Sequence, residues 1–122
     1  DATPVVSHTD LHDGQLLWDG TTLGVIDLDG ARLAEAALDL TNLRAHAELA
    51  RLRGSLSARG LDSIIGWLDD AARRMPTSQA RLNAYLDAAR LRLIFVHSFR
   101  PGSRAWLDDW RDHALGGLAN TP

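Results

Sequence analysis

One short segment near the amino terminus constrains the fold of this 122-residue chain most strongly. Two apolar runs, residues 16–18 and 23–26, flank the dipeptide Asp19-Gly20, which favours a tight turn with positive φ. The pattern predicts two antiparallel strands that double back on each other as a β-hairpin. Residue Gln15 at the entry of the first strand is therefore expected to lie near Asp27 at the exit of the second.

Polar residues gather at the two ends of this predicted hairpin. An H-x-D-x-x-x-x-Q motif places His8, Asp10 and Gln15 on the loop that leads into it. An I-D-x-D motif places Asp27 and Asp29 at its exit. Such a loop can bring several oxygen donors around one pocket. Carboxylate and amide oxygens suit a hard cation such as Mg²⁺ better than zinc.

This arrangement resembles the catalytic and metal-binding loops of the aminoglycoside phosphotransferase and choline kinase family, a branch of the protein-kinase-like fold. The family pattern is H-x-D-x-x-x-x-N, then I-D, then a helix that opens with a D-L pair, here Asp39-Leu40. Compact matches cover about residues 5–50. The chain departs from the pattern at Gln15, where Asn is usual, so the amide oxygen is kept but its reach grows by one methylene.

The resemblance implies a role for the residues of the motif. Asp10 would be the catalytic carboxylate that orients or deprotonates an acceptor hydroxyl. Gln15 and Asp27 would bind Mg²⁺. His8 would brace the loop, and Asp39 would accept hydrogen bonds from the backbone of the loop.

Three further residues near the motif are open to more than one interpretation. Asp29 could support the site by touching metal or substrate, or it could cap the segment that follows. His12 and Asp13 are expected to be solvated loop residues, with a contact to phosphate or substrate as the alternative.

Two other functions compete with the kinase-like interpretation. A metal-dependent hydrolase is one, because His8, Asp10, His12 and Asp13 form a dense group of potential ligands. Against it, no second cluster follows at metal-ligand spacing. The remaining histidines are expected to lie singly on predicted helices, at His46, His97 and His113. The second competing function is that of a non-catalytic helical binding module that has kept the loop.

Beyond the hairpin, apolar residues recur at helical spacing. They predict helices over about residues 34–53, 61–75, 79–99 and 103–118. The third is apolar over so much of its circumference that it is expected to be the central, most buried helix. The predicted class is α+β and mostly helical, with one hairpin over about residues 15–27 followed by about four helices. The resemblance places this portion in the C-terminal lobe of a protein-kinase-like phosphotransferase.

A single domain is expected over residues 1–122, with the catalytic loop and metal-binding hairpin over 5–30 and a helical subdomain over 34–118. A complete kinase-like enzyme needs a β-rich lobe whose Lys holds the nucleotide phosphates. This chain contains no Lys, because all 13 basic residues are Arg. The sequence is therefore interpreted as part of a C-terminal lobe, with the N-terminal nucleotide-binding lobe absent and the chain inactive on its own.

Composition sets further bounds on function. The absence of Cys excludes disulfides and thiolate zinc sites, and is compatible with the cytoplasmic location that we expect. The net charge of −3 and the scattered arginines leave no electrostatic footprint for nucleic acid. No apolar run is long enough to span a membrane.

The resemblance implies a small-molecule kinase. Its cofactor would be Mg²⁺, and ATP or GTP would donate the phosphoryl group. The acceptor would be a hydroxyl of an aminoglycoside-like, choline-like or sugar molecule. Self-association of the chain is also expected, because helices that lack their packing partners expose apolar patches.

Overall fold

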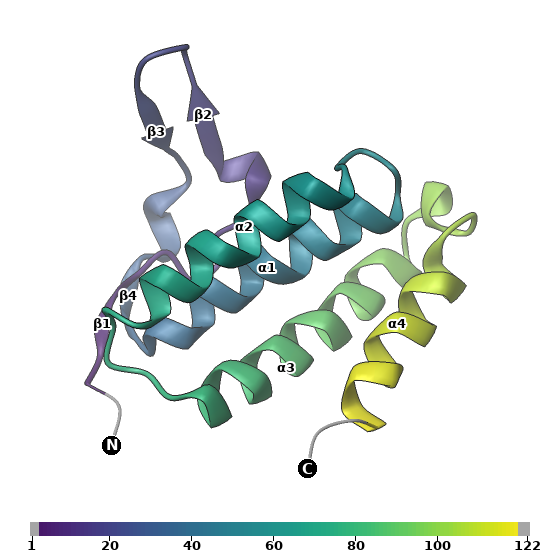
Figure 1. Ribbon diagram of the computed structural model, residues 1–122. Helices are drawn as coiled ribbons and strands as arrows, with labels where there is room; N and C mark the ends of the chain where they lie inside the picture. Colours follow the sequence, from purple (N-terminus) through teal and green to yellow (C-terminus); the bar gives the residue numbers. More distant parts are fainter. Residues whose placement is uncertain (1–2, 120–122) are drawn as a thin grey trace.

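The computed structural model describes residues 3–119, in which four helices pack together and two small sheets lie at the amino-terminal side (Figure 1). The predicted α+β, mostly helical class is confirmed. In chain order the elements are β1 (Val5–Ser7), η1 (Asp13–Gln15), β2 (Leu16–Trp18), β3 (Leu23–Val25), η2 (Leu28–Gly30), β4 (Arg32–Ala34), α1 (Ala36–Leu52), α2 (Ala58–Ala72), α3 (Gln79–Ser98), η3 (Pro101–Ser103) and α4 (Leu107–Ala119), where η denotes a 3₁₀ helix.

The predicted hairpin is present and projects away from the helices (Figure 1). Strands β2 and β3 pair antiparallel, with residues 16–18 opposite 23–25. A four-residue loop joins them, longer than the predicted dipeptide turn. The Asp19 carboxylate accepts hydrogen bonds from two backbone N–H groups of this loop, both at 2.8 Å. Gly20 has a φ of +102°, in the left-handed region that glycine adopts without strain.

A second two-stranded sheet was missed by the sequence analysis. Strand β1 pairs antiparallel with β4, with Val5 opposite Ala34 and Ser7 opposite Arg32. Each strand has three residues, which is too short for an alternating pattern to stand out. The sheet joins the segment before His8 to the segment before α1, so both ends of the motif region are anchored to the same place.

The helices depart from their predicted bounds mainly at their starts. Helix α2 begins three residues earlier than predicted, because the Ser57 side chain accepts a hydrogen bond from the backbone N–H of Gly60 at 3.0 Å and caps the helix. Helix α4 begins at Leu107, so the start predicted at about residue 103 is wrong. Ser103 lies instead in η3 and is buried.

The most buried helix is α1, and the prediction that the third helix would be the central one is wrong. Helix α1 contacts α2, α3, α4, β1 and η1. In α3 the buried positions are confined to one stripe, and two large apolar side chains outside it are open to solvent. Phe95 is 69% exposed and Leu91 is 40% exposed. The apolar residues around the circumference of α3 therefore did not identify the central helix of the fold.

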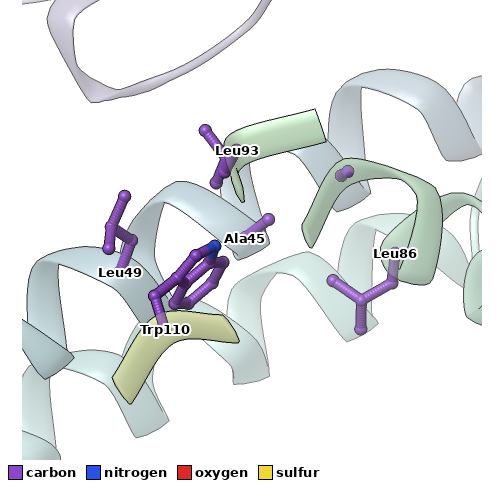
Figure 2. Packing of buried hydrophobic residues seen from close by; sticks show 6 residues of the cluster. Ala45, Leu49, Leu86, Leu93 and Trp110 are labelled. Atoms are coloured by element: carbon purple, nitrogen blue, oxygen red, sulfur yellow. The ribbon is translucent and has the colours of Figure 1, made fainter. Parts of the chain in front are cut away.

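The hydrophobic core lies where α1, α3 and α4 meet (Figure 2). Trp110 of α4 is fully buried and packs in one cluster with Ala45 and Leu49 of α1 and Leu93 of α3. Its indole Nε1 donates a hydrogen bond to the backbone carbonyl of Arg90 at 3.3 Å. One aromatic side chain therefore links three helices, and its only polar atom is satisfied.

A buried ion pair joins the same helices beside this core. The Glu48 carboxylate of α1 accepts hydrogen bonds from Arg90 of α3 at 2.8 and 2.9 Å, and lies 3.1 Å from the His113 ring of α4. Burial alone would raise the pKa of Glu48, but the hydrogen bonds and charge of Arg90 hold it below its ordinary value. Glu48 therefore remains a charged partner for α3 at neutral pH.

Large apolar side chains of the hairpin are open to solvent. Leu17, Trp18 and Leu23 are each more than half exposed. An apolar hollow of about 570 Å³ lies between the hairpin and the helices α1 and α2. The expected self-association stays a prediction.

Within residues 3–119, no helix combines the length and apolar character that crossing a membrane requires.

The position of Trp110 generates a stability prediction. Trp110→Ala should lower the free energy of unfolding by about 3–5 kcal/mol, because it leaves a cavity between three helices. The matched control is Trp67→Ala, since Trp67 is 69% exposed, and it should change stability by less than about 1 kcal/mol. Urea unfolding followed by circular dichroism measures both. Equal losses in the two variants would contradict this description of the core.

Candidate active site

The loop before the hairpin is held by a carboxylate in the first turn of α1. The two oxygens of Asp39 accept hydrogen bonds from the backbone N–H groups of His8, at 2.6 Å, and Thr9, at 2.8 Å. Thr9 has a φ of 74°, a left-handed conformation that residues other than glycine seldom adopt. Hydrogen bonds to an ionised acceptor are about twice as strong as neutral ones. Asp39 therefore stabilises the unusual backbone at the start of the loop.

The ring of His8 joins the two halves of the motif. Its Nε2 lies 2.7 Å from the backbone carbonyl oxygen of Ile26, and its Nδ1 lies 3.4 Å from the backbone nitrogen of Asp10. A carbonyl oxygen can only accept, so Nε2 carries the proton and Nδ1 accepts from the N–H of Asp10. The buried imidazole thus links the loop that carries Asp10 to the residue that precedes Asp27.

The hairpin brings Gln15 and Asp27 together. The side-chain Nε2 of Gln15 lies 3.1 Å from Oδ2 of Asp27. The backbone carbonyl of Gln15 also accepts the N–H of Ile26 at 3.0 Å. Gln15 is buried whereas Asp27 is exposed, and Asp27 has the left-handed φ of 62°. A fixed amide therefore lies against a carboxylate that faces solvent.

The separation of these two side chains fits Mg²⁺. Oxygen ligands of an octahedral Mg²⁺ lie about 2.1 Å from the ion, which puts neighbouring ligands about 3 Å apart. Nε2 of Gln15, whose place the amide oxygen takes when the amide turns over, lies 3.1 Å from Oδ2 of Asp27. One carboxylate and one amide are also the donor types that this ion prefers. The pair could hold the cation once the amide presents its oxygen.

Asp10 lies outside this pair and is held from another direction. Its Oδ1 accepts a hydrogen bond from Nη2 of Arg92, in α3, at 2.7 Å. Nη1 of the same guanidinium donates to Oδ1 of Asn42 at 3.0 Å, and Asn42 in turn donates to the carbonyl of Leu11 at 2.8 Å. The side chain of Asp10 remains 44% exposed. Its carboxylate is therefore oriented by two helices yet open to a substrate.

Sequence reasoning missed Arg92 and Asn42. Asn42 follows Asp39 by three residues on α1, and residues at this spacing share one face of a helix. That spacing is a local signal that could have found it. Arg92 is 82 residues from Asp10. Its contact depends on how α3 packs against α1, and no local pattern announces it.

Asp29 and His12 differ in how much the structure engages them. Asp29 is exposed in the first turn of η2 and is not part of the hydrogen bonds described above. His12 is less solvated than expected, because its ring stacks on His46 of α1 at 4.7 Å. Potential ligand atoms of His12, Asp13 and His46 lie within 4.8 Å of one another. His8 and Asp10, which the hydrolase interpretation includes, are engaged in the hydrogen bonds described above.

Of the three helical histidines only His46 departs from the expectation that they lie singly, because it meets His12 and Asp13. Burial, with a smaller contribution from His12, lowers the pKa of His46 to about 4, so its ring is neutral at pH 7. The ring of His97 lies 4.8 Å from that of Trp106. His113 contacts Glu48, as described above. Each of these rings therefore takes part in packing between elements.

Comparison with models of protein families gives a match over the amino-terminal part of the chain. Residues 1–74, more than half of the chain, match the model of the phosphotransferase enzyme family. This range contains the loop, the hairpin, α1 and α2. Searches of curated proteins and of solved structures found no significant match.

The contacts of Asp39 predict the effect of removing its charge. Asp39→Asn should lower the free energy of unfolding by about 1–3 kcal/mol, because an amide offers one acceptor oxygen to two N–H groups. The amides of His8 and Thr9 should also exchange with deuterium faster. Asp29→Asn is the control, because Asp29 is exposed. Unchanged protection of both amides in Asp39→Asn would show that another group holds the loop.

The lowered pKa of His46 predicts a pH dependence. The unfolded chain binds a proton below about pH 6.5, whereas the folded chain resists it until about pH 4. Stability should therefore be full above pH 6.5 and fall with acidification, by at most about 1.4 kcal/mol per pH unit from this group. Urea unfolding from pH 7 to pH 5 measures it. His46→Gln should show a shallower slope, and identical slopes would refute the assignment.

Proposed function

This chain belongs to the phosphotransferase enzyme family, and we propose that it carries the catalytic and metal-binding part of a small-molecule kinase. The kinase transfers the terminal phosphoryl group of ATP or GTP to a hydroxyl of an aminoglycoside-like, choline-like or sugar acceptor. One observation carries the proposal. The ring of His8 joins the loop that carries Asp10 to the end of the hairpin, where Asp27 lies against Gln15.

Asp10 is the catalytic carboxylate in this proposal. It accepts a hydrogen bond from the acceptor hydroxyl and aims the hydroxyl oxygen at the phosphorus. Arg92 and the loop backbone hold Asp10 in place, since the guanidinium contacts Oδ1 at 2.7 Å. Phosphoryl transfer depends mainly on positioning and charge neutralisation. The side chain therefore needs a fixed direction more than an unusual acidity.

Gln15 and Asp27 hold the cation on the other side of His8. Mg²⁺ bound there neutralises charge on the nucleotide phosphates. Asp27 contributes a formal negative charge and Gln15 contributes a neutral oxygen. We expect Asp27 to matter more for binding. Because no Lys is present among the 122 residues, the chain by itself binds the cation but does not clamp a nucleotide, and it is inactive alone.

A transition-metal hydrolase is the second candidate, favoured by the approach of His12, Asp13 and His46. Asp13 is well exposed, so the geometry of this group is not held as tightly as that of the Gln15–Asp27 pair. The two candidates differ in the metal that the protein should carry. A hydrolase of this type would retain zinc, manganese or iron through purification, whereas Mg²⁺ would exchange freely.

Substitutions at Asp10 and Asp27 should separate catalysis from cation binding. In a polypeptide that also carries a nucleotide-binding lobe, Asp10→Asn should lower the transfer rate about 10²–10⁴-fold, because the hydroxyl loses its acceptor. Its affinity for Mn²⁺, used as a probe, should be unchanged. The Asp27→Asn variant should lose both phosphoryl transfer and Mn²⁺ binding. Transfer is followed by ³¹P NMR and Mn²⁺ by electron paramagnetic resonance.

Two results would contradict the proposal. One is loss of cation binding in Asp10→Asn, which would make Asp10 a metal ligand. The other is a stoichiometric transition metal in the purified wild type that disappears on substitution of His12. Melting temperatures close to that of the wild type show that each variant has folded.

A further inference from the structure

The hydrogen bonds of His12 determine which of its ring nitrogens carries a proton. His12 caps η1, and its Nδ1 accepts the backbone N–H of Gly14 at 3.1 Å. A neutral imidazole has one N–H and one acceptor nitrogen, and an imidazolium has no acceptor. The ring is therefore neutral with its proton on Nε2. His12 Nε2 is a hydrogen-bond donor.

This donor faces the amide of Gln15, and the two contacts of that amide conflict. The same terminal atom of Gln15 lies 3.3 Å from Nε2 of His12 and 3.1 Å from Oδ2 of Asp27. An NH₂ group at that position donates to Asp27 but opposes the N–H of His12. An oxygen there accepts from His12 but opposes the carboxylate of Asp27. Neither orientation of the amide satisfies both neighbours.

A cation between the amide and the carboxylate removes the conflict. With the amide oxygen at the shared position, one lone pair accepts the N–H of His12 and the other is available to the cation, which Asp27 also binds. We propose that His12 is a positioning residue that turns the amide oxygen of Gln15 toward the cation. The inference rests on the proposed function, because it concerns the same cation.

The surroundings of His12 support this role. Its ring stacks on the ring of His46, with 18° between the planes, so α1 holds it in one orientation. Gln15 is only 8% exposed, so few other groups can reach its amide. The longer side chain of Gln has one more rotatable bond than Asn. A donor that restrains its end compensates for that freedom.

Mn²⁺ binding to the 122-residue chain tests the inference, measured by the loss of the free-ion signal in electron paramagnetic resonance. The informative variant is His12→Asn, because Asn can still accept the N–H of Gly14 but is too short to replace the ring at Gln15. Its Mn²⁺ affinity should fall about five- to tenfold, the value of one hydrogen bond. Circular dichroism melts check that the fold is intact.

A double-mutant cycle distinguishes orientation of the amide from a general effect on the loop. In Gln15→Glu the carboxylate presents an oxygen in either rotation, so it needs no donor to orient it. Adding His12→Asn to this variant should change the Mn²⁺ affinity less than about twofold. An equal loss in both backgrounds would overturn the inference.

Failure of the inference can be told apart from failure of the proposed function. If Asp27→Asn abolishes Mn²⁺ binding while His12→Asn binds as well as the wild type, the inference alone is overturned. If the wild type does not bind Mn²⁺, or Asp27→Asn has no effect, both are overturned. Loss of binding in His46→Ala, with Asp27→Asn unaffected, would place the cation at the His12, Asp13 and His46 group and would also overturn both.

Discussion

Two hydrogen bonds from consecutive backbone N–H groups to the carboxylate of Asp39 support the rest of the candidate site. They join the start of the loop to α1, the most buried helix. From there His8 carries the connection across to Ile26, and the hairpin places Asp27 beside Gln15. A loop with an unfavourable backbone conformation is therefore held by one charged side chain on a well-packed element.

The candidate site keeps two carboxylates apart, and the ring of His8 lies between the loop segments that carry them. Asp10 is held by the guanidinium of Arg92 and remains half exposed. Asp27 is held beside a buried amide and faces solvent. In the proposed function, keeping the two carboxylates apart lets Asp10 act on a hydroxyl while Asp27 binds a cation. The hydrogen bonds of His8 fix the distance between the two backbone segments that carry these carboxylates, because both ring nitrogens contact main-chain atoms.

The local parts of this arrangement could be predicted from the sequence. The hairpin depends on neighbouring residues, so its pattern brought Gln15 near Asp27 and indicated an oxygen-rich pocket. The family follows from the same motif. The pairing of β1 with β4 could not be predicted, because two strands of three residues carry almost no periodic signal.

Long-range packing limited the rest of the prediction. Arg92 reaches Asp10 only because α3 crosses α1, and the residues are 82 positions apart. The apolar circumference of α3 suggested a central helix, yet Phe95 is mostly exposed. Burial depends on which neighbours are present in space, and a helical pattern specifies only which faces are apolar.

The central claim is that Gln15 and Asp27 form one cation site at the base of the hairpin. A crystal of the chain soaked in Mn²⁺ and measured at the manganese absorption edge tests it most directly. The account predicts an anomalous peak that touches both the amide oxygen of Gln15 and the carboxylate of Asp27. A peak at His12, Asp13 and His46 instead, with none between Gln15 and Asp27, would contradict it.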